Sequence, residues 1–284
     1  MKNPHTLDLG MKSELYKKII HYSEVKSTND IAMDLAEQGV EEGTVVVADT
    51  QTEGRGRAGR TWSSPVGGLW FTIILRPDIE PVYAHQITFA ASIAVTTAIG
   101  NLRGLQAQIK WPNDILIKEK KVGGILLEIA TSGSTVEYLV VGIGLNLTVD
   151  PHHFPPEVSN IATSIASNLR PGTKISRDEI LRSILREFEV YYQLLKQKGF
   201  RHIIQKWKGM SNIVGREIRV DDPPNEPMEG KVVDIDTTGA LLIRTSKNAV
   251  LRVVSGTVTI VERSDWPWPI RVPSVPFPFP KGKD

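Results

Sequence analysis

The alternation of apolar and polar positions along the chain predicts a first domain built from strands and helices. Short apolar runs bounded by turn residues are typical of buried strands. A longer apolar segment at 84–102 has the length of a helix, and 177–198 carries an apolar stripe at helical spacing behind the capping residue Ser176. The expected strands span 44–48, 69–75, 108–110, 115–117, 122–129 and 136–147, the last two pairing as a hairpin.

A further helix is expected after Ser27, where Thr28, Asn29 and Asp30 precede an apolar pattern that stops at Gly39. Beyond residue 213 the pattern changes to short β runs separated by turn residues, which is the spacing of a small β-barrel. We therefore expect an α+β fold in four parts: a short N-terminal segment (1–22), a mixed domain (23–212), a β domain (213–263) and a tail rich in proline and aromatic residues (264–284).

Composition and charge exclude several classes of protein. The chain has 34 Lys and Arg against 32 Asp and Glu, so its net charge of +2 does not favour a dedicated nucleic-acid or membrane-surface protein. It has no cysteine, which excludes disulfides, thiolate metal sites and cysteine nucleophiles. The first residues lack the apolar core of a secretory signal, and no apolar stretch approaches the length of a membrane helix. We expect a soluble, cytoplasmic protein.

The segment 54–61, with the sequence GRGRAGRT, places arginines among glycines in a loop. It formally matches the G-x-G-x-x-G pattern and the phosphate-binding P-loop, but no helix can follow it, so both interpretations fail. Arg55, Arg57 and Arg60 nevertheless suit a flexible loop that surrounds an anion, because guanidinium makes paired hydrogen bonds to carboxylate and phosphate. The alternative is a solvated basic turn.

Three other segments place polar groups between apolar runs. The sequence KWPND at 110–114 combines a cation, an aromatic face, an amide and a carboxylate, which are suitable parts for a nucleotide site; alone, it could be an Asn-Asp turn beside a core tryptophan. Lys121 begins a strand that contains Gly123 and Gly124, and it is either a surface lysine or a cation for an acyl-phosphate. Asn146 lies in an apolar run and needs a partner, for which a ligand is one candidate.

These segments, in this order, resemble the catalytic domain of biotin protein ligases. GRGRAGRTWSSP at 54–65 and KWPNDILI at 110–117 carry the resemblance most specifically, and 213–262 is similar to the small SH3-like domain of that family. The resemblance implies a catalytic domain like that of class II aminoacyl-tRNA synthetases. It also implies an ATP- and Mg²⁺-dependent ligase that forms biotinyl-5'-AMP and transfers biotin to a lysine of a biotin carboxyl carrier protein.

The same resemblance assigns the site residue by residue. Lys121 and Arg57 are the expected catalytic residues, because biotin's carboxylate and the α-phosphate of ATP repel each other and need fixed cations between them. Asp114 is the candidate for holding Mg²⁺. The implied biotin-binding residues are Ser27, Thr28, Asn29, Gln51, Arg55, Gly56, Arg57, Lys121 and Gly124. The implied ATP-binding residues are Arg57, Arg60, Trp62, Trp111, Asn113, Lys121 and Asn146.

Alternatives from two other classes stay open. A lipoate protein ligase shares the fold and the adenylate chemistry, although the RxR loop followed by WxS favours biotin. A non-catalytic biotin-binding regulator would be expected to lack the loop or Lys121, and both are present. Because the segment 1–22 is too short for a helix-turn-helix domain, we expect no binding of operator DNA in a gel-shift assay. Exposed sheet edges leave a homodimer possible.

Overall fold

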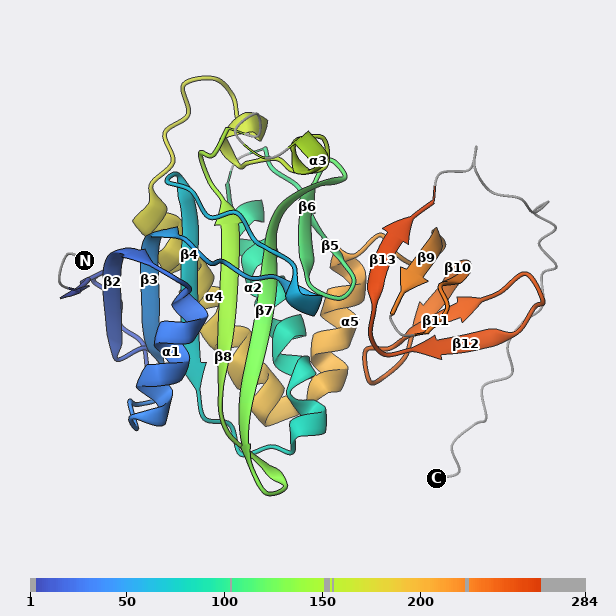
Figure 1. Ribbon diagram of the computed structural model, residues 1–284, viewed down its shortest axis with the longest axis horizontal. Coiled ribbons are helices and arrows are strands. Elements are labelled where there is room, and N and C mark those ends of the chain that lie inside the picture. The colour runs from blue at the N-terminus through green and yellow to red at the C-terminus, as the bar shows by residue number, and fades with distance from the viewer. Residues whose placement is uncertain (1–3, 103, 151–153, 155, 223–224, 262–284) are drawn as a thin grey trace.

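The structure, a computed structural model, describes residues 4–261 except 103, 151–153, 155, 223 and 224. Its larger part is an 8-stranded mixed sheet in the order β1-β2-β3-β4-β8-β7-β6-β5 (Figure 1). Strands β2 and β3 run parallel, and the other neighbouring pairs are antiparallel. The strands are β1 (His5–Thr6), β2 (Lys18–Val25), β3 (Thr44–Gln51), β4 (Gly68–Leu75), β5 (Ala107–Lys110), β6 (Asp114–Ile117), β7 (Lys120–Ser132) and β8 (Thr135–Asn146).

Helices cover both faces of this sheet. Helix α1 (Thr28–Glu37) lies on one face against β3, β4 and β8, while α2 (His85–Gly100), α4 (Arg177–Lys198) and α5 (Phe200–Met210) form a layer on the other (Figure 1). The caps follow the sequence: Ser27 accepts from the backbone N–H of Asn29, Ser176 accepts from that of Glu179, and α4 ends at Gly199, whose φ of 76° suits glycine. In the described residues, four short elements complete this part: α3 (Pro156–Ser159), η1 (Arg57–Gly59), η2 (Pro81–Tyr83) and η4 (Ala166–Asn168).

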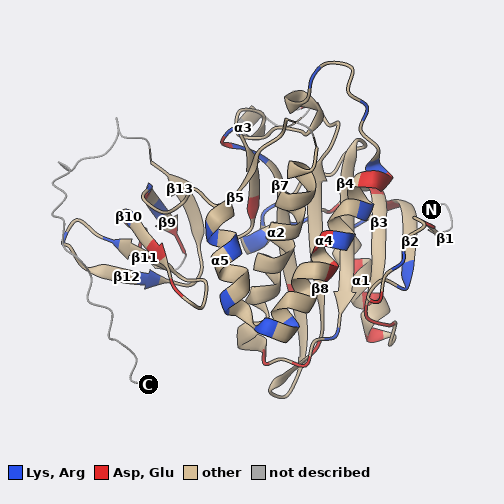
Figure 2. Ribbon diagram, turned by 180° about the vertical axis from the view of Figure 1, so that it is seen from behind, with Lys and Arg blue, Asp and Glu red and all other residues tan. Residues whose placement is uncertain are grey.

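Helix α2 is the centre of the hydrophobic core. It packs against the sheet and against α4 and α5, and nearly all of its residues from Phe89 to Ile99 are buried. Among the described residues, the stretch Pro81–Gly100 alone is apolar and long enough to pass a composition test for a membrane span, and most of it is buried inside the fold. The outer helix α4 instead carries charges of both signs along its surface (Figure 2).

The C-terminal domain is a five-stranded antiparallel sheet in the order β12-β11-β10-β9-β13. This arrangement confirms the predicted small β domain, and Ser255 and Gly256 lie between its last two strands. Gly256 lies at this break with a φ of 123°, a conformation that suits glycine. The strands are β9 (Glu217–Asp221), β10 (Met228–Ile235), β11 (Leu241–Arg244), β12 (Val250–Val253) and β13 (Thr257–Ile260).

One turn of the C-terminal domain docks onto the first domain. The carbonyl of Gly239 accepts from the indole N–H of Trp111 at 2.8 Å, and the carbonyl of Thr238 lies 2.8 Å from Nε2 of His85. Gly239 has a φ of 90°, and a Cβ there would meet the Phe89 ring at 2.8 Å. The turn is shaped by the carboxylate of Asp236, which accepts from the backbone N–H groups at positions 238 and 240. A glycine is therefore required where the two domains touch.

Two parts of the chain differ from expectation. We placed the start of the mixed domain at residue 23, but β1 and β2 belong to its sheet, and Ile19 and Ile20 are buried. Strand β2 buries two adjacent apolar residues and then carries polar ones, so no alternation marks it in the sequence. Helix α5 lies outside the predicted helices, although it buries Phe200, Ile203 and Trp207. The predicted tail at 264–284 lies outside the described residues.

Candidate functional site

A cavity of about 1180 Å³ extends from the N-terminus of α1, beneath the loop 54–64, to strand β13 of the C-terminal domain. A small-molecule site usually has a volume of roughly 300–1,000 Å³. The larger volume found here suits two ligands that meet end to end, or one long ligand. The two ends of the cavity differ in their chemistry.

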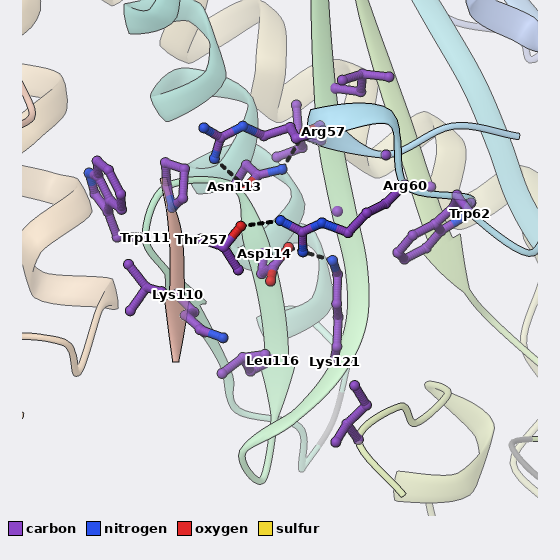
Figure 3. A pocket seen from close by; sticks show the side chains of 18 of the residues that line it. Arg57, Arg60, Trp62, Lys110, Trp111, Asn113, Asp114, Leu116, Lys121 and Thr257 are labelled. Carbon is purple, nitrogen blue, oxygen red and sulfur yellow. Dashed lines mark hydrogen bonds and ion pairs between the residues drawn. The ribbon is translucent and has the colours of Figure 1, made fainter. Parts of the chain in front are cut away.

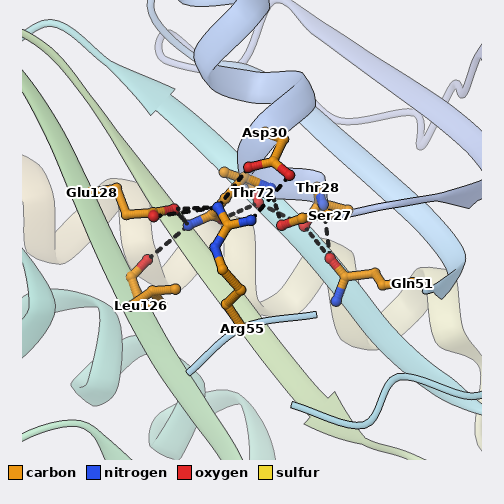
Figure 4. A network of polar contacts seen from close by, with 9 residues as sticks. Ser27, Thr28, Asp30, Gln51, Arg55, Thr72, Leu126 and Glu128 are labelled. Atoms are coloured by element: carbon orange, nitrogen blue, oxygen red, sulfur yellow. Dashed lines mark hydrogen bonds and ion pairs between the residues drawn. The ribbon is translucent and has the colours of Figure 1, made fainter. Parts of the chain in front are cut away.

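The end of the cavity near α1 is lined by uncharged polar side chains that bond to one another (Figure 4). Oε1 of Gln51 accepts from the backbone N–H of Thr28 at 2.8 Å and from its hydroxyl at 3.0 Å, while Nε2 of Gln51 donates to Ser64 at 2.7 Å. The hydroxyl of Thr72 lies 2.8 Å from that of Thr28 and 2.7 Å from Oδ1 of Asn29. This inner end therefore offers amide and hydroxyl groups in fixed positions to a neutral polar ligand.

Arg55 points toward this inner end, but two carboxylates hold its guanidinium group (Figure 4). Nη1 and Nη2 donate to the two oxygens of Asp30 at 3.0 and 2.6 Å, and Nη2 lies 3.3 Å from both oxygens of Glu128. The hydrogen bond to Asp30 is the main reason that the pKa of Arg55 is raised above its ordinary value, with Glu128 adding to the effect. Arg55 is therefore a fixed part of the cavity wall in this arrangement.

The opposite end of the cavity is cationic, with Arg57, Arg60, Lys110 and Lys121 around a single central carboxylate, Asp114 (Figure 3). The ammonium of Lys121 lies 2.5 Å from Oδ1 of Asp114. The same ammonium lies 5.0 Å from the centre of the Trp62 ring, within range of a cation–π contact. With Arg216 and Lys231, these cations outnumber the lining carboxylates of Asp114, Glu119 and Glu217, so this end is positively charged and suited to an anion.

Burial changes the charge properties of two of these cations. The pKa of Arg57 is lowered first by its burial and then by the neighbouring charge of Arg60. Burial is also the largest reason that the pKa of Lys110 is lowered, and the positive charges of Lys121 and Arg60 act in the same direction. Because desolvated cations of like sign destabilise one another, a polyanion that enters between them is strongly favoured.

The orientation of the loop arginines depends on both domains. Arg57 donates to Oδ1 of Asn113 at 3.2 Å, and Asn113 in turn donates to the carbonyl of Ile125 at 2.7 Å, which fixes the amide between β6 and β7. Arg60 donates to the hydroxyl of Thr257 on β13 of the C-terminal domain (Figure 3). The loop therefore bridges the sheet and the β domain over the cationic end.

Glycines on the central strands make room for these side chains. A Cβ at Gly142 would lie 2.2 Å from Oδ1 of Asn29, and one at Gly144 would lie 2.7 Å from the indole nitrogen of Trp62. At Gly124 an added Cβ would instead be 3.4 Å from the Lys121 side chain, which is ordinary contact. Gly142 and Gly144 thus accommodate protein side chains, whereas Gly124 borders the open cavity.

The cavity brings together fourteen of the fifteen residues that the sequence predicts for the site. The fifteenth, Asn146, does not line the cavity. It is 3% exposed, and its Nδ2 donates to the carbonyl of Thr163 at 3.0 Å. That backbone partner satisfies Nδ2, whereas Oδ1 is buried without a partner among the described residues, so the assignment of Asn146 to ATP stays a prediction. The residues that line the cavity are Ser27, Thr28, Asn29, Gln51, Arg55, Gly56, Arg57, Arg60, Trp62, Trp111, Asn113, Asp114, Lys121 and Gly124.

Trp111 lines the cavity with very little of its surface. Its side chain is 2% exposed, and its indole N–H is bonded to Gly239 of the C-terminal domain. The ring face expected for a nucleotide base is therefore turned into the interface between the domains. Trp62, which is partly exposed and lies beside Lys121, is the available aromatic ring at this end.

The donor set does not form a metal site held by the protein alone. In the described part of the chain, no cluster of three or more His, Asp or Glu could hold a metal ion. Asp114 contributes one carboxylate, and Lys121 already occupies one of its oxygens. Asp114 could therefore bind Mg²⁺ only together with phosphate oxygens of ATP, and its assignment to Mg²⁺ stays a prediction.

The C-terminal domain contributes residues to the cavity that the sequence patterns do not reveal. Arg216, Lys231 and Thr257 line it from β9, β10, β13 and the segments beside them. Glu119 on the β6–β7 turn bonds to Arg216 at 3.2 Å, so that turn also fixes the position of the domain. Lys110 could have been identified from its place beside Trp111 in the sequence. The residues of the C-terminal domain could not, because they reach the cavity through contacts between segments that are far apart in the chain.

Comparisons with known proteins agree with this architecture. Residues 20–146 match the Biotin/lipoate A/B protein ligase family, and residues 213–260 match the Biotin protein ligase C terminal domain. The Bifunctional ligase/repressor BirA of Bacillus subtilis strain 168 is 39% identical over 240 residues, which cover 84% of this chain and 73% of that relative. The Biotin--[acetyl-CoA-carboxylase] ligase of Paracoccus denitrificans is 34% identical over 227 residues, which cover 77% of this chain and 90% of that relative.

A solved structure supports the same assignment. The biotin protein ligase from Aquifex aeolicus in complex with biotin and ATP superposes with a TM-score of 0.74 at 31% sequence identity, covering 87% of this chain and 99% of that chain. The fold, the two-ended cavity and these relatives lead to the same conclusion: the chain belongs to the biotin protein ligase family.

Proposed function

We propose that this protein is an ATP-dependent ligase that forms biotinyl-5'-AMP and transfers biotin to a lysine of a biotin carboxyl carrier protein. The observation that carries the proposal is a continuous cavity with a neutral polar end beside α1 and a cationic end beside Lys121. Biotin has a neutral ureido ring at one end and a carboxylate at the other, and ATP supplies the larger negative charge. The two ligands thus match the two ends of the cavity.

We assign the inner end to biotin. The amide of Gln51 and the hydroxyls of Ser27 and Thr28 are suited to the ureido group, because donors and acceptors alternate along that wall. Asn29 is 4% exposed and supports this wall from behind. Gly124 borders the path along which the acyl chain would extend toward the cationic end.

We assign the cationic end to the phosphates and the adenosine of ATP. Arg57, Arg60 and Lys121 are placed to surround phosphate oxygens, and Lys110 adds a fourth positive charge. Trp62 supplies an aromatic face near this end. For Trp111, in view of its burial, we propose a structural role in the docking of the C-terminal domain.

In the first step, a carboxylate oxygen of biotin attacks the α-phosphorus of ATP, the bond from that phosphorus to the β-bridging oxygen breaks, and diphosphate leaves. Two anions must approach each other for this to occur. Lys121 and Arg57 lower the barrier by placing positive charge beside both, within a partly desolvated cavity where such charges act more strongly. The ion pair with Asp114 keeps the ammonium of Lys121 in place before ligands enter.

In the second step, the neutral amine of the acceptor lysine attacks the acyl carbon, the bond to the phosphate oxygen breaks, and AMP leaves with the electron pair. The amide nitrogen loses a proton to the surrounding groups. The loop 54–64 covers the cavity, so it protects the mixed anhydride from water until the acceptor arrives. Mg²⁺ remains a prediction, and no step above depends on it.

The direct test is incubation with ATP, Mg²⁺, labelled biotin and a biotin carboxyl carrier domain, with the label scored on the acceptor lysine. We expect label on the acceptor and none on a carrier whose target lysine is replaced by arginine. Preferential labelling with lipoate would assign the chain to the lipoate branch of the family. Binding of biotin without any transfer would support a non-catalytic regulator. The absence of operator-DNA binding stays a prediction for the gel-shift assay.

A further inference from the structure

The loop 54–64 is held at its inner edge by an ion-pair group from two separate elements. Asp30 lies in the first turn of α1, and Glu128 lies on β7, yet both contact the guanidinium of Arg55 (Figure 4). With Asp30 the contact is a two-point fork, which fixes the direction of the guanidinium as well as its distance. The three side chains are between 32% and 41% exposed, so the group is neither buried nor fully solvated.

One of the two carboxylates is itself fixed by the core. Oε2 of Glu128 accepts from Nδ2 of Asn29 at 2.6 Å, and Oδ1 of Asn29 accepts from the hydroxyl of Thr72 on β4. Asn29 and Thr72 are both buried. The position of Glu128 is therefore set by groups that cannot move easily, and Arg55 is attached to that rigid point.

The remaining contacts of the loop divide into a base and a tip. At the base, the backbone of Gln51 donates to Ser64 at 3.0 Å and that of Trp62 donates to Gly54 at 2.8 Å, so both ends of the loop stay together. At the tip, Arg57 of η1 is half-buried, and the other two residues of η1 are exposed. Between base and tip, the contact made by Arg55 is what ties the loop to the side of the cavity near α1.

We propose that Asp30 and Glu128 are positioning residues that clasp Arg55, hold the loop over the acyl-adenylate and so set how long that intermediate is retained. This inference rests on the proposed function and extends it to residues without contact to the reacting atoms. The partial exposure of the clasp matters, because a fully buried pair would lock the loop, and a fully exposed pair would add almost nothing. An intermediate exposure allows the loop to open and close.

The clasp also separates Arg55 from the cations that receive phosphate. Two carboxylates against one guanidinium give the group a net charge of −1, so it does not attract a further anion. Within the part of the chain that the structure describes, no carboxylate forms an ion pair of this kind with Arg57 or Arg60, whose side chains contact Asn113 and Thr257. Neighbouring arginines of one loop therefore have different tasks, one closing the loop and two facing the phosphates.

The test compares Asp30→Asn and Glu128→Gln with the unmodified protein. Labelled biotinyl-adenylate is formed on the enzyme, excess unlabelled biotin is added, and the label that remains bound is followed by rapid filtration, with hydroxylamine as a trap for exposed adenylate. We expect the bound lifetime to shorten roughly three- to tenfold in each variant, in line with the loss of a partly exposed charged contact. The rate of adenylate formation at saturating ligands should stay within about twofold.

Ionic strength and a conservative variant distinguish a clasp from a general structural role. Salt screens partly exposed pairs, so it should shorten the adenylate lifetime in the unmodified protein but not in the double variant. Asp30→Glu keeps the charge and should restore part of the lifetime. Glu53→Gln is the matched control: it removes a more exposed ion pair with Lys26 at the base of the loop, and it should leave the lifetime unchanged.

A ligand-free measurement keeps the clasp testable even if no adenylate forms. Trypsin cleaves after arginine and needs a segment that can be drawn into its active site, so release of the loop from its clasp should let both variants be nicked after Arg57 and Arg60 several-fold faster than the unmodified protein. Equal lifetimes and equal nicking would overturn the proposal. A loss of biotin affinity with an unchanged lifetime would also overturn it, because the carboxylates would then only shape the pocket. Absence of adenylate in the unmodified protein would count against the proposed function instead.

Discussion

The indole N–H of Trp111 donates a 2.8 Å hydrogen bond to the carbonyl of Gly239, and this contact joins the segment 110–114 to the C-terminal domain. Asn113, two residues along the chain, orients Arg57 at the cationic end. The position of the small β domain is thereby linked to the geometry of the catalytic cavity.

Replacing Trp111 by Phe keeps a large ring but leaves the carbonyl of Gly239 without its donor. We expect a loss of about 1–3 kcal/mol in the free energy of unfolding relative to the unmodified enzyme. The KM for ATP should rise more than the KM for biotin. Chemical denaturation and steady-state kinetics measure these effects. Trp207→Phe is the control, since Trp207 is equally buried but bonds to Ser92 within the first domain. It should lose stability without a selective change in KM.

Gly239→Ala tests the contact between the domains from the other side. The added Cβ would meet the Phe89 ring at 2.8 Å, and the φ of 90° disfavours any side chain. We expect a destabilisation on the order of 1–3 kcal/mol, seen as a lower Tm and faster proteolysis between the domains. Gly209→Ala in α5, where nothing lies within 4 Å of the new Cβ, should instead raise Tm slightly. An unchanged Tm for Gly239→Ala would contradict the docking role of this turn.

Lys121→Ala should slow adenylate formation far more than it weakens the binding of ATP, because charge at this position matters most where phosphate charge develops. We expect a loss of roughly 10²–10³-fold in the single-turnover rate, comparable to removal of one electrostatic stabiliser. Lys120→Ala removes an exposed neighbour on the same strand and should leave the rate nearly unchanged. Equal losses in rate and affinity would indicate that Lys121 only binds the ground state of ATP.

The ionisation of Asp236 should make the C-terminal domain less stable at low pH. Burial acts to raise the pKa of Asp236, but hydrogen bonds from Thr238, Arg252 and the backbone of Ala240 outweigh it and lower the pKa from 3.8 to about 2. The charged form is thus favoured by folding. Its stabilisation is complete above the unfolded value of 3.8 and is lost as pH falls toward 2.

Asp236→Asn should therefore lower the free energy of unfolding by about 2 kcal/mol near neutral pH. The difference from the unmodified protein should shrink as pH falls through the same interval, because protonation removes the charge of Asp236 in any case. Unfolding curves recorded across that range measure the effect. Asp221→Asn, which removes an exposed pair with Arg219, serves as the control and should show little difference at any pH. A constant difference would exclude linkage to the ionisation of Asp236.

Local sequence patterns predicted most of the elements that frame the site. The caps at Ser27 and Ser176, the apolar run that became α2 and the hairpin of β7 and β8 depend on residues close together in the chain, so a short window contains their cause. The resemblance to the family then indicated the site residues, and all of them except Asn146 line the cavity. Strand β2 and helix α5 were not predicted, because their stability comes from contacts with residues distant in sequence.

The chemical groups of the site could be identified from the order of residues alone: a loop with three arginines, a lysine at the start of a strand and a set of uncharged polar residues near Ser27. The role of each group depends on the fold. It turned Trp111 into the domain interface, gave Asn146 a backbone partner and placed Asp30 and Glu128 around Arg55. A hydrogen bond or ion pair depends on separation in space, and the fold brings together groups that lie as many as 197 positions apart in the chain.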